Sequence, residues 1–149
     1  MSIPAEAQPS IHASCVVIGE QGVMIRGESG SGKSTLARHL ISRAKQSGTF
    51  ASLVGDDRLY LSESNGRLIA SGHPEIAGKI EVRGVGILET DFERSCIIRL
   101  VVDCSKQVGL RSPDEEDRMV SIRGVQLPRI VTVATDADVV LLILGQIKT

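Results

Sequence analysis

The chain has 149 residues and a mass of 15.9 kDa, which is the size of one ordinary domain. Its 17 basic and 18 acidic side chains give a formal net charge of −1, so it has no field that would attract a polyanion. With one Tyr, two Phe and no Trp, it also offers few rings on which bases could stack. We therefore expect no nucleic-acid partner.

The cysteines and the hydropathy pattern predict a reduced, soluble, cytoplasmic protein. Cys15, Cys96 and Cys104 have neither metal-ligand nor redox spacing, and each lies in or beside a Val/Ile run. We expect each to be a small buried apolar group. The first ten residues do not resemble a signal peptide. The longest aliphatic run, residues 139–144, is far shorter than the ~20 residues of a membrane helix, so no membrane partner is expected.

The first third of the chain predicts a hairpin followed by a helix. Residues 1–10 lack apolar periodicity and are expected to be a loose lead-in. The apolar runs 14–18 and 23–26 are joined by a short connection with glycine at both ends, which predicts a hairpin. A glycine-rich segment at 27–35 then leads into apolar residues at helical spacing, and Gly48 is the expected stop.

The rest of the chain is typical of strands, expected at 53–54, 59–61, 67–70, 96–102, 131–133 and 139–144. Asn65-Gly66 predicts a hairpin, and Asp136 with Asp138 predicts an acidic turn between the last two strands. In the alternating segment 81–88, the glycines at 84 and 86 suggest close approach of another backbone. Residues 111–118 are densely charged and expected to be exposed. One long helix among many strands predicts a single α/β domain over residues 1–149, with a mixed sheet.

Residues 27–34, Gly-Glu-Ser-Gly-Ser-Gly-Lys-Ser, match the phosphate-loop pattern G-x-x-x-x-G-K-[ST] in full. The glycines let backbone N–H groups point at phosphate oxygens, and the following helix N-terminus adds partial positive charge. Lys33 would reach the terminal phosphates and Ser34 would ligate Mg²⁺. The pattern predicts a site for a nucleotide or another phosphate compound; the alternative is a turn without a ligand. Contacts are expected from Gly27, Glu28, Ser29, Gly30, Ser31, Gly32, Lys33, Ser34 and Thr35.

Carboxylates near two strand ends could complete such a site. Asp56 and Asp57 follow the strand at 53–54, and Glu81 lies further along the chain. One carboxylate of the pair could hold metal-bound water while the other takes a proton from an attacking hydroxyl. The alternative is that the pair forms a turn or a helix cap, and that Glu81 is an ordinary surface residue.

Several segments together resemble HPr kinase/phosphorylase, a bacterial family that acts on a serine of the phosphocarrier protein HPr. The phosphate loop is close to the family's G-[DE]-S-G-x-G-K-S, and His12 precedes it at the distance of the family's active-site histidine. The other similarities are residues 54–57 to V-A-D-D, 81–87 to E-I-R-G-x-G-I and 124–128 to G-V-x-[VL]-P. The likeness runs from about His12 to Leu144, and the segment 81–87 is its most specific part.

The resemblance implies a P-loop domain with a mixed β-sheet and a nucleotide-binding core like that of phosphoenolpyruvate carboxykinase. It also implies an ATP- and Mg²⁺-dependent serine kinase whose substrate is an HPr-like carrier. The resemblance implies that Lys33 stabilises charge on the transferred group and that Ser34 and Glu81 bind Mg²⁺. It implies that Asp57 is the general base and that His12 orients the Asp57 carboxylate. The implied catalytic arginine is Arg111, and Arg118 is the alternative.

The departures from the family pattern are also informative. Only eleven residues precede His12, which is similar to the short forms of alphaproteobacteria that lack the N-terminal domain. The chain stops soon after Leu144, before the C-terminal helices that participate in the family's assembly, so a homo-oligomer is an expectation without a defined size. The family's P-V-R-P-G-R-N loop appears here at 132–138 without its two arginines and with two aspartates. Loss of that anion-binding charge argues against phosphorylase activity.

Two other functions remain open from the sequence. A small-molecule kinase would need an arginine-rich lid, for which residues 111–118 are the candidate. A nucleotide-binding regulatory module would bind ATP without transferring a phosphoryl group, and the missing arginines of the last loop are compatible with it.

Overall fold

The computed structural model describes residues 10–106 and 118–147 of the chain. Arg111 and the lead-in residues 1–9 lie outside the described residues. The elements, in chain order, are β1 (Ala13–Ile18), β2 (Gln21–Arg26), α1 (Lys33–Gln46), β3 (Ala51–Gly55), β4 (Leu59–Ser64), β5 (Arg67–Gly72), a 3-10 turn (Pro74–Ile76), β6 (Lys79–Val82), β7 (Gly86–Glu89), β8 (Ser95–Ser105), β9 (Met119–Ile122), β10 (Val125–Val133) and α2 (Ala137–Leu144).

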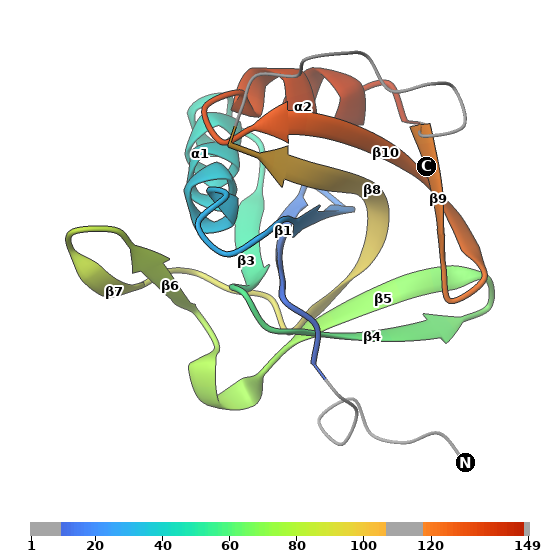
Figure 1. The fold of residues 1–149 in the computed structure, drawn as a ribbon, viewed down its shortest axis with the longest axis horizontal. Helices are drawn as coiled ribbons and strands as arrows, with labels where there is room; N and C mark the ends of the chain where they lie inside the picture. Colours follow the sequence, from blue (N-terminus) through green and yellow to red (C-terminus); the bar gives the residue numbers. More distant parts are fainter. Residues whose placement is uncertain (1–9, 107–117, 148–149) are drawn as a thin grey trace.

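The central sheet has the strand order β3-β1-β2-β8-β10-β9, and β6 and β7 form a separate hairpin (Figure 1). The β1–β2 and β4–β5 pairs are antiparallel hairpins, as the sequence predicts. Parallel pairing joins β2 to β8 and β8 to β10, whereas β1 is antiparallel to both of its neighbours. The expected mixed sheet is therefore confirmed.

The direction of the strands brings several segments to one edge of this sheet. Because β3 and β2 both run antiparallel to β1, they run in the same direction, which β8 and β10 share. All four strands therefore end at one edge. Ligands of α/β sheets bind outside the carboxyl ends of the strands. At this edge lie the glycine-rich segment after β2, the Asp56-Asp57 pair after β3, and Lys106 after β8.

The long strand β8 connects two layers of the molecule. Its first residues pair with β5, at Ile97↔Ile69, and its later residues pair with β2 and β10. One core lies between the central sheet and the two helices, and a second lies between the other face of the sheet and the β4–β5 hairpin. Figure 1 shows α1 and α2 on one side of the sheet, β4 and β5 on the other, and the β6–β7 hairpin projecting outward.

Helix α1 is held against the sheet by one apolar stripe. Its fully buried positions Leu36, Ala37, Leu40 and Ala44 recur at the three- and four-residue spacing of a helix face. Gly48 adopts a φ of +78° just beyond the helix, which is the left-handed conformation expected where a glycine ends it. This packing fixes the N-terminus of α1 at the carboxyl edge of the sheet.

The strand predicted at 139–144 is wrong, because this run lies in helix α2. Val140 and Leu144, four residues apart, are buried, whereas Leu142 between them is 64% exposed. A strand would have placed all three side chains on one face. Short apolar runs fit either structure, and packing against α1 decides for the helix here. Asp138 lies in the first turn, where a carboxylate favours a helix.

The close backbone approach predicted at Gly84 and Gly86 is also wrong. A β-carbon built on either residue would meet nothing within 4 Å. Both residues lie in the exposed β6–β7 hairpin and have positive φ values, +82° and +114°. Glycine is favoured there by the shape of the turn, because it adopts positive φ without a steric cost.

The cysteines follow the expectation in two of three cases. Cys15 and Cys104 are buried, and burial raises the pKa of both thiols above their usual range. Cys96 is only half-buried, and its Sγ lies 3.4 Å from the Sγ of Cys15. Within the described ranges, neither helix is long and apolar enough to cross a bilayer.

A cluster of charged side chains connects β2, the strand before the glycine-rich segment, to β8 and β10. Asp103 on β8 accepts hydrogen bonds from Arg26 on β2 at 2.7 and 2.9 Å, and from Arg129 on β10 at 2.5 Å. Burial raises the pKa of Asp103, but the hydrogen bonds from the two arginines outweigh it, so the pKa lies below its usual value of 3.8. The charged form is therefore favoured by folding.

Replacing Asp103 with asparagine should destabilise the fold in a pH-dependent way. Because the folded-state pKa is lowered, the stabilisation is present above the unfolded pKa and is lost as pH falls through the folded one. At pH 7 we expect the variant to lose about 1–3 kcal/mol in urea unfolding, and the difference from wild type should shrink below about pH 4. Asp138→Asn is the control, since its pair with Arg43 is exposed. A difference that stays constant down to pH 3 would contradict this account.

Candidate functional site

The segment matching the phosphate-loop pattern lies between β2 and α1 and is packed tightly at both ends. A β-carbon on Gly27 would lie 2.7 Å from the Cys104 carbonyl oxygen, and one on Gly32 would lie 2.5 Å from the β-carbon of Ala134. Gly32 also has a φ of +105°. These two glycines let β8 and the residue after β10 approach the loop directly. The loop therefore has a fixed place at the carboxyl edge of the sheet.

The N-terminus of α1 is open toward this edge. Among the described residues no side chain caps the helix, and no acidic residue lies in its first turn. The first N–H groups of a helix have no partner within it and carry partial positive charge. An anion placed before Lys33 would accept their hydrogen bonds.

Lys33 extends back along the loop from the first position of α1. Its side chain is only 6% exposed, and its Nζ donates hydrogen bonds to the carbonyl oxygens of Gly27 at 3.0 Å and Glu28 at 3.4 Å. The same nitrogen lies 3.3 Å from a carboxylate oxygen of Asp57. These contacts hold the ammonium group between the loop and the acidic pair after β3.

Asp56 connects three parts of the site. Its Oδ1 accepts hydrogen bonds from the Oγ atoms of Ser34, at 2.5 Å, and Ser14, at 3.0 Å. Its Oδ2 accepts the backbone N–H of Glu81 at 3.0 Å. One carboxylate thus links the start of α1, the strand β1 and the β6–β7 hairpin.

Asp57 has a different environment from its neighbour. Its backbone N–H donates to Ser14 Oγ at 3.0 Å, and its φ of +61° places it in the left-handed region. The side chain is 51% exposed and, apart from its contact with Lys33, is open to solvent. The two adjacent carboxylates therefore differ in environment: both oxygens of Asp56 accept hydrogen bonds, whereas the Asp57 carboxylate is half-exposed in the site.

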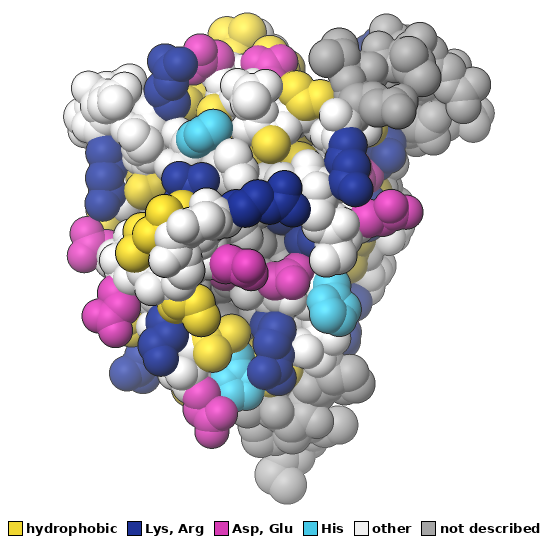
Figure 2. Space-filling model, turned by 60° about the vertical axis from the view of Figure 1, so that its left-hand side comes forward, with side chains coloured by type: hydrophobic (Ala, Val, Ile, Leu, Met, Phe, Trp, Pro, Cys, Tyr) yellow, Lys and Arg dark blue, Asp and Glu magenta, His cyan; other side chains and the backbone are white. Residues whose placement is uncertain are grey.

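These residues surround a polar pocket of about 470 Å³. Its lining residues are Ser29, Gly30, Gly32, Lys33, Ser34, Thr35, Asp57, Glu81, Arg83 and Lys106. Figure 2 shows the side of the molecule on which α1 and the β6–β7 hairpin come forward, with basic and acidic side chains next to one another across its middle. The pocket therefore contains two kinds of group. Its cationic side chains could bind phosphates, and its carboxylates could bind a cation or a proton.

The donor set fits a magnesium ion held jointly with phosphates. Mg²⁺ prefers oxygen ligands and commonly takes only one or two from the protein. The Ser34 hydroxyl beside Asp56 and the exposed carboxylate of Glu81 supply oxygens of this kind. In the described residues, no group of three or more His, Cys, Asp or Glu side chains could hold a metal alone.

Some of the predicted site residues line the polar pocket and others do not. Lys33, Ser34, Asp57 and Glu81 lie together in the pocket, as do four further members of the predicted phosphate-loop set, Ser29, Gly30, Gly32 and Thr35. The remaining three, Gly27, Glu28 and Ser31, do not line it. His12 is exposed just before β1 and does not line the pocket, although Ser14, two residues on, touches both aspartates. Arg118 is exposed before β9 and does not line it either.

Sequence reasoning did not assign four residues that the structure brings to the site. Asp56 was recognised only as one of a pair without a role of its own, and Arg83 only as part of a segment. Ser14 had no signal beyond its place in an apolar run, where a buried hydroxyl needs a partner. Lys106 had none, because its approach to the loop depends on the pairing of β8 with β2.

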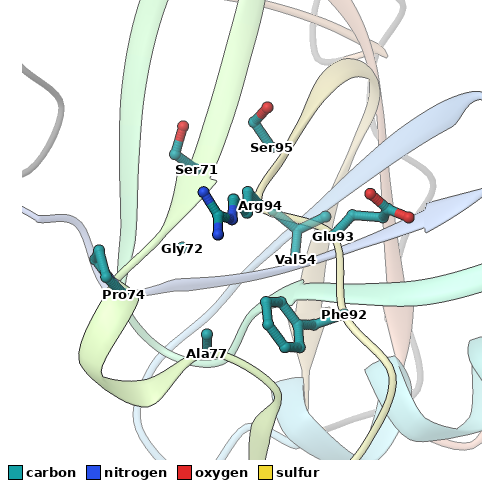
Figure 3. A pocket seen from close by; sticks show the side chains of 9 residues that line it. All are labelled: Val54, Ser71, Gly72, Pro74, Ala77, Phe92, Glu93, Arg94 and Ser95. Atoms are coloured by element: carbon teal, nitrogen blue, oxygen red, sulfur yellow. The ribbon is translucent and has the colours of Figure 1, made fainter.

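A second pocket, of about 400 Å³, lies apart from these residues. Figure 3 shows its lining, with Arg94 between Ser71 and Ser95 and the Phe92 ring facing Ala77. None of the predicted site residues within 10–106 and 118–147 lines it. The phosphate-loop segment and the aspartate pair make the polar pocket the better candidate for chemistry.

Fold and pocket together give an α/β domain in which a glycine-rich loop and a carboxylate pair lie at the carboxyl edge of a mixed sheet. The family described as HPr Serine kinase C-terminal domain matches residues 5–143, and the chain belongs to this family.

Named relatives agree with this assignment. HPr kinase/phosphorylase of Enterococcus faecalis is 31% identical over 146 residues, which cover 90% of this chain and 45% of that protein. The Mycoplasma mycoides protein of the same name is 40% identical over 78 residues, covering 52% of this chain and 23% of its own length. The chain thus spans less than half the length of these relatives. Among solved structures, the Hpr(Ser) kinase/phosphatase from Coxiella burnetii matches with a TM-score of 0.72 and 26% identity, over 93% of this chain and 95% of that one.

Proposed function

We propose that this chain is an ATP- and Mg²⁺-dependent serine kinase that phosphorylates an HPr-type phosphocarrier protein. The observation that carries the proposal is the convergence of Lys33, Ser34 and Asp57 on one pocket in a member of this family. The names of the relatives supply the substrate class.

In the proposed reaction, the loop and the N-terminus of α1 bind the phosphates of ATP through backbone N–H groups. Bound Mg²⁺ would neutralise charge on the phosphates, held by the Ser34 hydroxyl and the Glu81 carboxylate. Lys33 would follow the phosphoryl group as its charge develops. Its present contacts with the carbonyl oxygens of Gly27 and Glu28 would be replaced by contacts with phosphate oxygens.

Asp57 would accept the proton of the attacking serine. Its exposed carboxylate allows a protein side chain to approach within hydrogen-bonding distance, which general base catalysis requires. Asp56 would not serve this role, because hydrogen bonds from two serine hydroxyls and one backbone N–H already occupy its oxygens. Its function would be to fix Ser34 for the metal.

The reverse reaction is not part of this proposal. The loop between β10 and α2 carries Ala134 against Gly32 and contains Asp136, whereas the family segment that it resembles carries two arginines. An acidic loop beside the phosphate pocket disfavours binding of a second anion such as inorganic phosphate.

The test is transfer of label from γ-labelled ATP, with Mg²⁺, to a purified HPr-type carrier. The control carrier has alanine in place of its acceptor serine. We expect label only on the unmodified carrier, and the labelled carrier should keep its phosphate when returned to the enzyme with inorganic phosphate. If ATP binds but neither carrier is labelled, the chain is not a kinase of this substrate.

A further inference from the structure

Lys106 is a cationic group of the pocket that neither the loop pattern nor the family segments single out. It follows the last residue of β8, and its ammonium group lies over the middle of the phosphate-loop segment. A β-carbon placed on Gly30 would lie 3.7 Å from Lys106 Nζ and 4.0 Å from Nη2 of Arg83. Gly30 itself is exposed and has a φ of +81°, so its backbone is open on the side that Lys106 covers.

Three contacts determine the position of Lys106 relative to the loop. Arg26, just before the loop, is paired with Asp103 three residues before Lys106. The Cys104 carbonyl packs against Gly27, and the Cys104 thiol donates to the Ser31 carbonyl oxygen at 3.4 Å. The end of β8 is therefore attached to the beginning and the middle of the loop. These contacts fix the backbone from which the Lys106 side chain extends.

The charge of the pocket gives Lys106 a function. The lining contains three cationic side chains, Lys33, Arg83 and Lys106, and the two carboxylates of Asp57 and Glu81. Without Lys106 the lining would be neutral, although the phosphates it is proposed to bind carry several negative charges. In the described part of the chain, no hydrogen bond or ion pair occupies the Lys106 ammonium group, whereas Lys33 contacts two carbonyl groups and Asp57.

We propose that Lys106 is a catalytic residue that contacts the terminal phosphates of the bound nucleotide and stabilises the charge that develops during phosphoryl transfer. This inference rests on the proposed kinase function. Lys33 would approach the phosphates from the buried side of the loop, and Lys106 from the opposite, solvent-exposed side. In other phosphoryl-transfer enzymes a cationic finger supplied by the same chain or by a partner has this role. Here it would be supplied by the strand beside the loop.

The test compares Lys106→Gln and Lys106→Arg with Lys45→Gln as the matched control. Lys45 lies in the last turn of α1, roughly 18 Å along the helix from Lys33, and forms an exposed ion pair with Asp91. Because Lys106 is exposed, each variant should retain the wild-type melting temperature. Transfer to the carrier gives kcat and the KM for the carrier, and calorimetry gives the Kd of a non-hydrolysable ATP analogue and of ADP.

We expect Lys106→Gln to lower kcat by about 10²-fold with an unchanged carrier KM. The Kd of the triphosphate analogue should rise by less than about tenfold relative to the wild type, and the Kd of ADP should change little. Lys106→Arg should restore most of the rate, because a cation remains at the site. The Lys45→Gln control should behave as wild type in every assay.

Two results for Lys106→Gln would overturn the proposal. The first is a kcat and an affinity for the triphosphate analogue that both match the wild type. The second is an increase in the KM for the carrier alone, which would make Lys106 a carrier contact. The binding assay needs no carrier and separates this inference from the kinase proposal. If the wild-type protein transfers nothing, loss of the triphosphate preference in Lys106→Gln still supports a terminal-phosphate contact. If wild type and Lys106→Gln then bind the triphosphate analogue with equal affinity, the proposed contact is rejected.

Discussion

Replacing Lys33 with alanine will lower kcat for phosphoryl transfer by about 10³-fold or more, because the variant loses the buried charge closest to the transferred group. Lys33 is 6% exposed and directed along the loop by two carbonyl oxygens, so no neighbouring side chain can move into its place without rebuilding the loop. The affinity for ATP should fall more than that for ADP, since the lysine of this motif reaches the terminal phosphates. Rates with the phosphocarrier and titrations with fluorescent nucleotides measure both effects.

The fold of this variant must be shown to survive. The shortened side chain leaves a small gap at the start of α1 and removes the ion pair between the buried Lys33 ammonium group and the half-exposed Asp57 carboxylate. Lys45→Ala provides the same change of residue at an exposed position of the same helix. If Lys33→Ala retains the circular dichroism of the wild type and still transfers phosphate within tenfold of its rate, the role of Lys33 is wrong.

Replacing Asp57 with asparagine will lower kcat by about 10²–10⁴-fold while leaving ATP affinity within a few-fold, because the variant loses the proton acceptor and not the phosphate contacts. Asparagine is the most suitable replacement here. Asp57 has a φ of +61°, a conformation that asparagine adopts more readily than most residues. The backbone N–H bond to Ser14 Oγ should therefore persist.

The neighbouring carboxylate is the matched control for this variant. Asp56→Asn disturbs the hydrogen bonds that hold Ser34, so it should raise the Mg²⁺ concentration needed for half-maximal rate. Asp57→Asn should leave that concentration unchanged. Measuring the rate against Mg²⁺ for both variants distinguishes the two roles, and a shared loss of Mg²⁺ affinity would contradict the assignment of Asp57 as the base.

Much of the candidate site could be predicted because it depends on local sequence. A complete phosphate-loop pattern between a strand and an amphipathic helix specifies its own geometry, and Asp56-Asp57 directly follows a buried strand. The Asn65-Gly66 turn specifies the β4–β5 hairpin in the same way, as its positive φ values at both residues show.

The features that were missed depend on contacts between distant segments. The last apolar run, with Val140 and Leu144, becomes a helix because α1 offers a surface for one helical face. Ser14 acquires its role from aspartates 42 and 43 residues away. Lys106 reaches the loop only because β8 lies parallel to β2 in one particular register, Arg26↔Asp103. A register of this kind is decided by the packing of the whole sheet.

The most direct test of this account is a single-turnover reaction of the protein with γ-labelled ATP, Mg²⁺ and an HPr-type carrier, followed by localisation of the label by mass spectrometry. The account predicts one phosphoryl group per carrier, on its acceptor serine, and no transfer by the Lys33→Ala or Asp57→Asn variant on the same time scale. Label that appears on the serine equally fast with both variants, or no label at all from a wild-type protein that binds ATP, would contradict it.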